Sequence, residues 1–139
     1  MSRKLAREFC MKVLFEMEMN NEMNVESIKL YMDREPQKIE QQEYVHTSIT
    51  KTIENLEEID TYIKQYSKGW KLNRIANVDL AILRLALTEM LHMGEIPYRV
   101  SVNEAIELGK KYSAEESASF INGILGRFIE EEEGIKNDD

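Results

Sequence analysis

The sequence has few of the residues on which several classes of protein depend. It contains one cysteine, two prolines and six glycines in 139 residues. One cysteine cannot form an internal disulfide, which favours a reducing, cytoplasmic location. No GxGxxG or GxxxxGK[ST] motif is present, so the usual phosphate loops of dinucleotide and nucleotide-triphosphate enzymes are missing. Uninterrupted apolar runs are only a few residues long, as at Val13–Phe15, and we expect neither a membrane span nor a cleaved leader.

Charge is distributed unevenly along a chain whose formal net charge is −8. The first 13 residues carry four basic side chains and one acidic side chain, whereas the tail over 130–139 carries six acidic residues and one lysine. The overall acidity argues against indiscriminate nucleic-acid binding by the whole surface, but it permits one basic patch near the N-terminus. We interpret the acidic tail as a solvated end of the chain.

Apolar residues recur at helical spacing throughout the chain, without an alternating strand pattern or an internal repeat. The patterns predict helices over about 3–17, 25–32, 40–66 and 77–93. The first has Ser2 as a possible N-cap, and the third is long enough to bend or break near Asn55. The fourth is apolar on most sides, which is typical of a central, buried helix. The sequence therefore predicts an all-α fold.

Two further helices are predicted near the C-terminus. They open with the capping-box sequences Ser101-x-x-Glu104 and Ser113-x-x-Glu116. Gly123 and Gly126 lie inside the last helical pattern, where each costs about 1 kcal/mol relative to alanine. Close approach of another helix or of a ligand is the physical reason to expect glycine there.

The N-terminal helix combines a core stripe with a basic strip. At about 100° per residue, one side carries the apolar stripe Ala6, Phe9, Cys10, Val13 and Met17. The neighbouring strip carries Lys4, Arg7, Met11 and Phe15, with Arg3 at its edge. Clustered cations bind phosphates and a nearby ring can stack on a base, as in single-stranded RNA recognition. These residues alone favour a basic first turn with a second packing face, and leave a nucleic-acid site as the alternative.

Two Glu-x-x-His pairs, Glu43 with His46 and Glu89 with His92, have the spelling of a di-iron four-helix site. Glu43 points away from the apolar stripe of its helix, which weakens that interpretation. Glu89 falls among apolar residues, and a buried carboxylate needs a hydrogen bond or an ion pair. Cys10 lies in the apolar stripe and is interpreted as a core residue. We therefore predict no metal, no cofactor and no catalytic residue.

Four ordered segments carry a more specific pattern. They are Trp70-Lys71-Leu72-x-Arg74, Val78-Asp79-x-Ala81-Ile82-Leu83-Arg84-x-Ala86-x-x-Glu89, Ile96-Pro97-x-x-Val100-x-Val102-Asn103-Glu104-Ala105-Ile106-Glu107-Leu108 and Phe120-Ile121-Asn122-Gly123-Ile124-Leu125. Together with Arg7-Glu8 and Leu14-Phe15 near the start, they resemble the NusB family of bacterial transcription antitermination factors. The resemblance covers essentially the whole chain. It implies a single domain over 1–139, with about seven helices in two small bundles, about 1–66 and about 70–133, packed together.

The resemblance implies a non-enzymatic, RNA-binding function. Family members pair with the ribosomal small-subunit protein NusE and bind the boxA element of nascent single-stranded RNA. The complex joins other Nus factors on RNA polymerase, notably during ribosomal RNA synthesis. Carried over by position, the RNA-binding residues are Arg3, Lys4, Arg7, Phe15, Arg99 and Phe120. The partner-binding residues are Asp79 and Arg84.

This chain departs from the family pattern at two places in the first helix. Phe15 stands where the family usually has tyrosine, which keeps a stacking ring and loses a hydroxyl donor. Leu5 stands where relatives carry another basic residue. Two other functions stay open: a stand-alone recruiting module like the N-terminal domain of some RNA methyltransferases, and a di-iron four-helix protein. The sequence does not distinguish a monomer from a homodimer.

Overall fold

The computed structural model describes residues 2–34 and 39–137, and within these ranges the chain forms helices and turns without a β-strand. The α-helices are α1 (Arg3–Met19), α2 (Ile28–Met32), α3 (Ile39–Glu54), α4 (Leu56–Tyr66), α5 (Asn77–His92), α6 (Tyr98–Tyr112) and α7 (Ser117–Asn137). Short 3₁₀ helices, η1 (Val25–Ser27) and η2 (Leu72–Arg74), precede α2 and α5. The all-α prediction is confirmed, and the long third helix breaks at Asn55 between α3 and α4.

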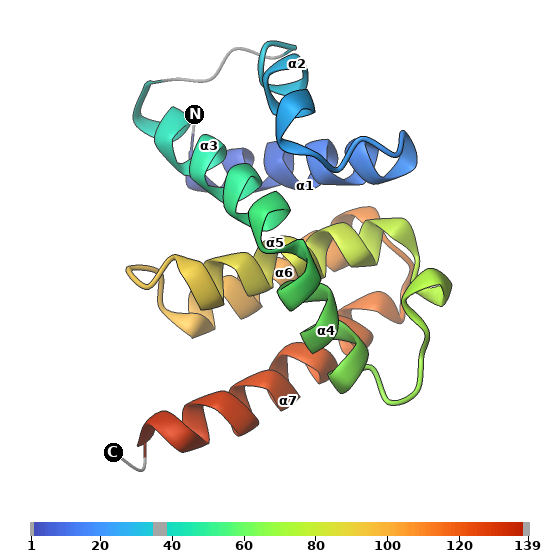
Figure 1. Ribbon diagram of the computed structural model, residues 1–139. Helices are drawn as coiled ribbons and strands as arrows, with labels where there is room; N and C mark the ends of the chain where they lie inside the picture. The colour runs from blue at the N-terminus through green and yellow to red at the C-terminus, as the bar shows by residue number, and fades with distance from the viewer. Residues whose placement is uncertain (1, 35–38, 138–139) are drawn as a thin grey trace.

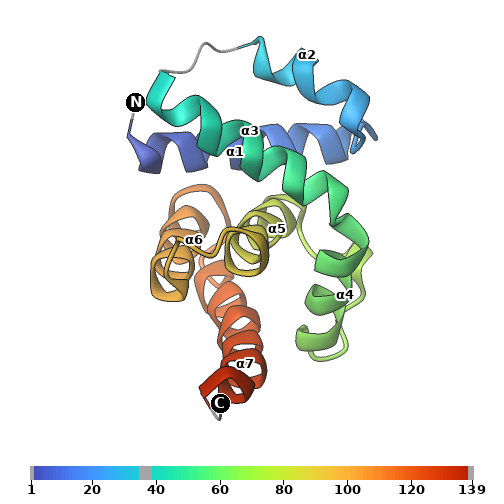
Figure 2. The same ribbon diagram turned by 60° about the vertical axis from the view of Figure 1, so that its left-hand side comes forward.

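Helix α5 is the centre of the fold (Figure 1). Every residue from Asp79 to Met90 is buried, because α5 packs against α1, α3, α4, α6 and α7. In Figure 2, α5 is viewed almost end-on, with α1 and α3 above it, α7 below it, and α4 and α6 on either side. The apolar character of this helix on most sides thus correctly predicted a central position.

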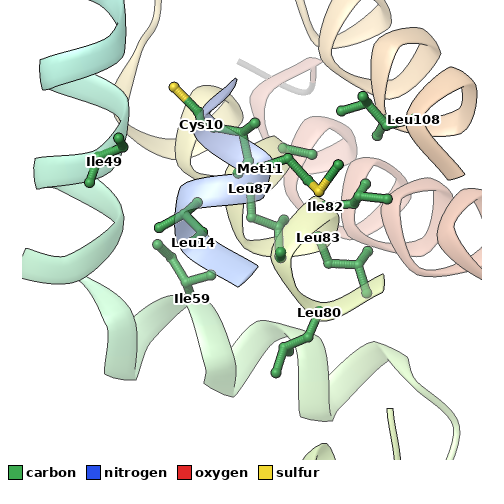
Figure 3. Packing of buried hydrophobic residues seen from close by; sticks show 14 of the residues in the cluster. Cys10, Met11, Leu14, Ile49, Ile59, Leu80, Ile82, Leu83, Leu87 and Leu108 are labelled. Atoms are coloured by element: carbon green, nitrogen blue, oxygen red, sulfur yellow. The ribbon is translucent and has the colours of Figure 1, made fainter. Parts of the chain in front are cut away.

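One continuous hydrophobic core joins the helices on both sides of α5. Figure 3 shows side chains of α1 (Cys10, Met11 and Leu14) packed with those of α5. Helix α4 contacts α7 as well as α5. Helix α4 thus packs with helices that follow it in the chain, although the predicted N-terminal bundle extends to about residue 66.

The helix starts agree with the sequence prediction at Ser2 and differ at two later serines. The Ser2 hydroxyl accepts a hydrogen bond from the Leu5 N–H at 3.1 Å, so Ser2 is the N-cap of α1. Helix α6 begins at Tyr98, which places Ser101 inside the helix. Ser113 is the C-cap of α6, and α7 begins at Ser117. The Ser101 and Ser113 hydroxyls donate to buried carboxylates, so they do not form the predicted capping boxes.

Close helix approach occurs at Gly109. A Cβ added there would lie 2.9 Å from Ile121 Cδ1, so glycine lets α6 pack tightly against α7. A Cβ on Gly123 would make ordinary contact with Arg127 at 3.5 Å, and one on Gly126 would meet nothing within 4 Å. Packing within the described residues therefore explains neither Gly123 nor Gly126. Of the two predicted reasons for glycine at these positions, close approach of another helix is not found, and close approach of a ligand stays a prediction.

Helix α7 continues to Asn137, so the backbone of the acidic tail is helical up to that residue. Asp138 and Asp139, which complete the tail, lie outside the described residues. Across 2–34 and 39–137, none of the helices is both long enough and apolar enough to cross a membrane.

Candidate nucleic-acid interface

Helices α1 and α6 both pack on α5 and are joined to each other by ion pairs between long side chains. Lys4 Nζ lies 3.5 Å from Glu104 Oε1, and Lys111 Nζ lies 3.0 Å from Glu8 Oε2. Residue numbers rise together in these two pairs, so the two helices run in the same general sense. Arg99, in the first turn of α6, is therefore at the same end as Lys4. We call the surface that carries Lys4, Lys12, Arg99 and Lys111, with Arg3 beside it on the side of α3, the α1–α6 seam.

The cations of the seam are exposed. The Arg3 guanidinium lies 4.2 Å from the centre of the Tyr44 ring, and its Nε donates to Gln41 at 3.0 Å. Arg99 has no hydrogen-bond or ion-pair partner among the residues that the structure describes. Arg99 can meet a phosphate group without losing a partner, whereas Lys4 and Lys111 would exchange their carboxylate partners for phosphate.

Arg7 is buried beneath the seam, with 6% of its surface exposed. Its Nε donates to Glu89 Oε2 at 2.8 Å, and its Nη2 donates to Glu89 Oε1 at 3.2 Å. The hydroxyls of Tyr44 and Ser101 also donate to this carboxylate. Of the residues that the sequence analysis placed on the basic strip of the first helix, Arg7 and Met11 are therefore buried. The burial of Arg7 argues against the predicted direct contact with RNA, and Glu89 has the buried partners that its apolar surroundings require.

The charge of Glu89 sets the ionisation of its neighbours. Burial alone lowers the pKa of the Arg7 guanidinium, but the hydrogen bonds and charge of Glu89 outweigh burial and raise it. Burial, followed by the charge of Glu89, raises the pKa of Tyr44 well above its usual value. Tyr44 thus stays neutral and keeps the proton that it donates. Burial also raises the pKa of Cys10, whose side chain lies in the core as predicted.

The two Glu-x-x-His pairs have separate surroundings. Glu43 and His46 are exposed, whereas Glu89 is buried with Arg7. His92 Nε2 lies 2.7 Å from Glu58 Oε1. In the described part of the chain, no group of three or more His, Cys, Asp or Glu side chains could hold a metal ion. The geometry therefore gives no support to a di-iron site.

Both predicted partner-binding residues have buried side chains. Asp79 accepts hydrogen bonds from Ser113 and from Ser117, the latter at 3.0 Å, and so ties α5 to the turn between α6 and α7. Arg84 donates from Nε and Nη2 to Asp60 at 2.9 and 2.8 Å, and from Nη1 to Glu18. Asp79 lines a cavity that also contacts Phe120, and Arg84 lines a separate hollow beside Lys64. The burial of both side chains gives no exposed charge to support the predicted role of Asp79 and Arg84 in partner binding.

The two predicted stacking rings are half-buried. Phe15 packs against the hydrophobic core near the end of α1. Phe120, in the first turn of α7, packs edge-to-face with Trp70, with ring centres 6.2 Å apart. Phe120 follows the C-terminal end of α6, whereas Arg99 lies at its start, and a helix of this length spans about 22 Å. The candidate residues therefore line a path and do not converge on one point.

Sequence reasoning missed a further contact on the seam. The Tyr112 hydroxyl and Lys111 Nζ both donate to Glu8, and Lys12 lies 5.2 Å from the centre of the Tyr112 ring. The available signal was the Lys110-Lys111-Tyr112 sequence at the end of a predicted helix. Its pairing with α1 depends on tertiary packing, which helical periodicity does not report.

Comparison with known proteins decides the family. The model of the NusB family matches residues 4–130. The chain belongs to the NusB family. A transcription antitermination protein NusB from Alkaliphilus oremlandii (strain OhILAs) is 55% identical over 132 residues, which cover 95% of this chain and 96% of that protein. The family is one of antitermination factors and not of enzymes, so this member is non-enzymatic.

Solved structures in this family share the fold. T. maritima NusB matches with a TM-score of 0.83 and 35% identity, covering 91% of this chain and 89% of that chain. A chain in the structure of antitermination factors NusB and NusE in complex with double-stranded RNA matches with a TM-score of 0.78 and 25% identity. The match covers 90% of this chain and 93% of that chain.

Proposed function

We propose that this chain is a cytoplasmic transcription antitermination factor that binds boxA-type single-stranded RNA together with the ribosomal small-subunit protein NusE. The observation that carries the proposal is membership of the NusB family over residues 4–130, in a chain with exposed cations along the α1–α6 seam. A solved relative that contains NusE and RNA supports both classes of partner. Other Nus factors and RNA polymerase complete the proposed assembly, notably in ribosomal RNA synthesis.

The α1–α6 seam would hold the RNA backbone. Arg3, Lys4 and Arg99 supply positive charge at one end, and Lys12 and Lys111 continue it along the two helices. Phe15 and Phe120 supply rings toward the other end. Because the seam carries few cations, RNA affinity should be modest. Because each phosphate contact releases counterions, that affinity should fall steeply as the salt concentration rises. The acidic remainder of the surface disfavours RNA placed elsewhere.

The buried Arg7–Glu89 pair would contribute indirectly. Glu89 is on α5, Arg7 on α1 and Ser101 on α6, so the pair and its hydrogen bonds hold α1 and α6 to the same central helix. This arrangement fixes the spacing between Lys4 and Arg99 before RNA arrives. A preformed spacing reduces the ordering cost of binding.

NusE would act through linked equilibria. A second protein that contacts the same RNA raises the affinity of the complex, and the coupling acts equally in both directions. The charged groups of Asp79 and Arg84 are held by partners within the chain. We therefore propose that the chain pairs with NusE without naming these two residues as its contacts.

The test is fluorescence anisotropy with labelled RNA, with and without NusE, at two salt concentrations. The oligonucleotides are a boxA-like strand, a scrambled strand of equal length, and a duplex form of the boxA-like strand. The expected result is preference for the boxA-like single strand, strengthened by NusE. NusE binding without any preference among the RNAs would support a recruiting module instead, and an absence of binding to any of them would overturn the proposal.

A further inference from the structure

A second basic region lies between α4 and α5. Residues 61–78 contain four basic residues and no acidic residue, in a chain whose net charge is −8. The four are Lys64, Lys68, Lys71 and Arg74, and all are exposed. Within the described residues, none of them forms an ion pair. This concentration of unpaired positive charge suits a polyanion.

An exposed aromatic ring stands in the middle of this region. Trp70 is the only tryptophan of the chain, and 55% of its surface is exposed. Its backbone is held in a tight turn: the Trp70 N–H donates to the Ser67 carbonyl at 3.3 Å, and the buried Ser67 Oγ lies 3.0 Å from the Trp70 carbonyl. Lys68 and Gly69 have φ of 53° and 89°, which reverses the chain before Trp70. The ring is thus presented by an ordered turn.

Trp70 separates two hollows of different character. One is a cavity of about 260 Å³ whose wall is mostly apolar and includes Phe120 and Ile75; the acidic residues Asp79 and Glu116 also line it. The other is a hollow of about 330 Å³ lined by Lys68, Gly69, Trp70, Lys71 and Arg74. Trp70 and Arg74 line both. The apolar wall beside Trp70 suits a stacked base, and the cations of the neighbouring hollow suit the phosphate of the same nucleotide.

We propose that the surface formed by Lys68, Trp70, Lys71 and Arg74, here called the α4–α5 surface, binds a nucleotide of single-stranded RNA. The base stacks on Trp70 beside Phe120, and the adjoining phosphate lies among the cations. This inference rests on the proposed function and extends it, because Phe120 lies beyond the C-terminal end of α6 and joins the α4–α5 surface to the α1–α6 seam. RNA that leaves the seam would continue onto Trp70.

The single tryptophan provides a direct measurement. The full chain is titrated with boxA-like single-stranded RNA while Trp70 emission and the anisotropy of labelled RNA are followed in parallel. The expected result is quenching of Trp70 emission over the same RNA concentrations as the rise in anisotropy. Trp70→Ala should weaken binding by roughly 5- to 100-fold, and Trp70→Phe should restore most of the affinity because a ring remains.

Charge variants test the phosphate contact separately. The double variant Lys71→Gln/Arg74→Gln should reduce the magnitude of the log–log salt slope by about 0.7 for each phosphate that is no longer neutralised. The matched control is Lys29→Gln/Lys51→Gln, which removes the same charge from α2 and α3 and should leave the slope unchanged. Circular dichroism of each variant establishes that it is folded.

The outcomes separate this inference from the proposed function. If anisotropy shows RNA binding, but the RNA does not quench Trp70 emission and Trp70→Ala does not lower the affinity, the inference is overturned and the proposed function stands. A change in Trp70 emission with NusE, and none with RNA, would make the α4–α5 surface a protein interface and would also overturn the inference. An absence of RNA binding in both signals, with and without NusE, would overturn the proposed function itself.

Discussion

The Arg7 guanidinium and the Glu89 carboxylate, 82 positions apart in the sequence, form a buried two-point ion pair between α1 and α5. The exposed surfaces of the two side chains are only 7% and 1%. Tyr44 from α3 and Ser101 from α6 complete the hydrogen bonds to the carboxylate. One acidic side chain on the central helix thus fixes three other helices.

Glu89→Gln is expected to destabilise the fold by about 3–5 kcal/mol, because it leaves the Arg7 charge buried and unpaired. Arg7→Met should destabilise the fold by a comparable amount, because it leaves the Glu89 carboxylate buried without its positive partner. Urea unfolding at neutral pH measures both. The double variant Arg7→Met/Glu89→Leu should lose less than the sum of the single losses, by about 1–3 kcal/mol. Strict additivity would show that the pair is not energetically coupled.

Sequence reasoning predicted that Glu89 needs a partner but could not name the partner. A buried carboxylate is visible from the apolar residues around it in a helical pattern. Its counter-charge comes from a helix near the other end of the chain, and no local pattern encodes that pairing. The same limitation explains Arg7: helical periodicity placed it on a strip beside Lys4, but could not show that α5 and α6 cover the strip beyond its first turn.

RNA binding should depend on the exposed cations of the α1–α6 seam. The double charge reversal Lys4→Glu/Arg99→Glu is expected to weaken RNA binding at least ten-fold and to reduce its salt dependence, because two phosphates would no longer be neutralised. Thermal stability should change little, since both side chains are exposed. Anisotropy and a melting curve measure the two effects.

The contrasting variant is Arg7→Met, which should lower stability more than it lowers the RNA affinity of the protein that remains folded. Measured well below the melting temperature, its affinity should be much closer to wild type than that of Lys4→Glu/Arg99→Glu. An equal loss of affinity in a fully folded Arg7→Met variant would return Arg7 to the group of residues that bind RNA directly.

The sequence predicted the kind of residues in the candidate site better than it predicted how far the site extends over the surface. A basic first turn near an aromatic ring left RNA binding as the alternative to a packing face, and the family resemblance favoured RNA. The exposure of Arg3, Lys4 and Arg99 is compatible with that expectation. The exposure of Trp70 was not predicted, because a tryptophan within a family motif is equally consistent with a core position. Its solvent exposure depends on a turn with two successive positive φ angles, only one of which falls on glycine.

Substitution by alanine should change the free energy of unfolding in opposite directions at Gly109 in α6 and at Gly126 in α7. Gly126→Ala is expected to stabilise the protein by about 0.5–1 kcal/mol, because alanine favours helix and the new Cβ meets nothing within 4 Å. Gly109→Ala should destabilise it, since the new Cβ would lie 2.9 Å from Ile121 Cδ1. Urea unfolding of both variants tests the assignment. Stabilisation by both would show that α6 and α7 separate easily.

The Glu8 carboxylate makes stability depend on pH in the acidic range. Burial raises the pKa of Glu8, but the hydrogen bonds from Tyr112 and Lys111 and the charge of Lys111 outweigh burial, and the pKa falls below its usual 4.5. The unfolded chain therefore binds this proton at a higher pH than the folded chain does. The stabilisation is complete above about pH 4.5 and is lost as pH falls through the lower, folded-state pKa.

Glu8→Gln should remove this dependence. The free energy of unfolding of the wild type minus that of Glu8→Gln is expected to shrink steadily from pH 5 toward about pH 3, because only the wild type takes up a proton at this site. Taking the difference cancels the titration of the carboxylates that the two proteins share. Lys111→Gln provides the control: it removes one source of the depressed pKa and should shift the loss toward higher pH. A difference that stays constant over this range would mean that Glu8 titrates alike in the folded and unfolded chains, and that its contacts with Lys111 and Tyr112 do not favour its charged form.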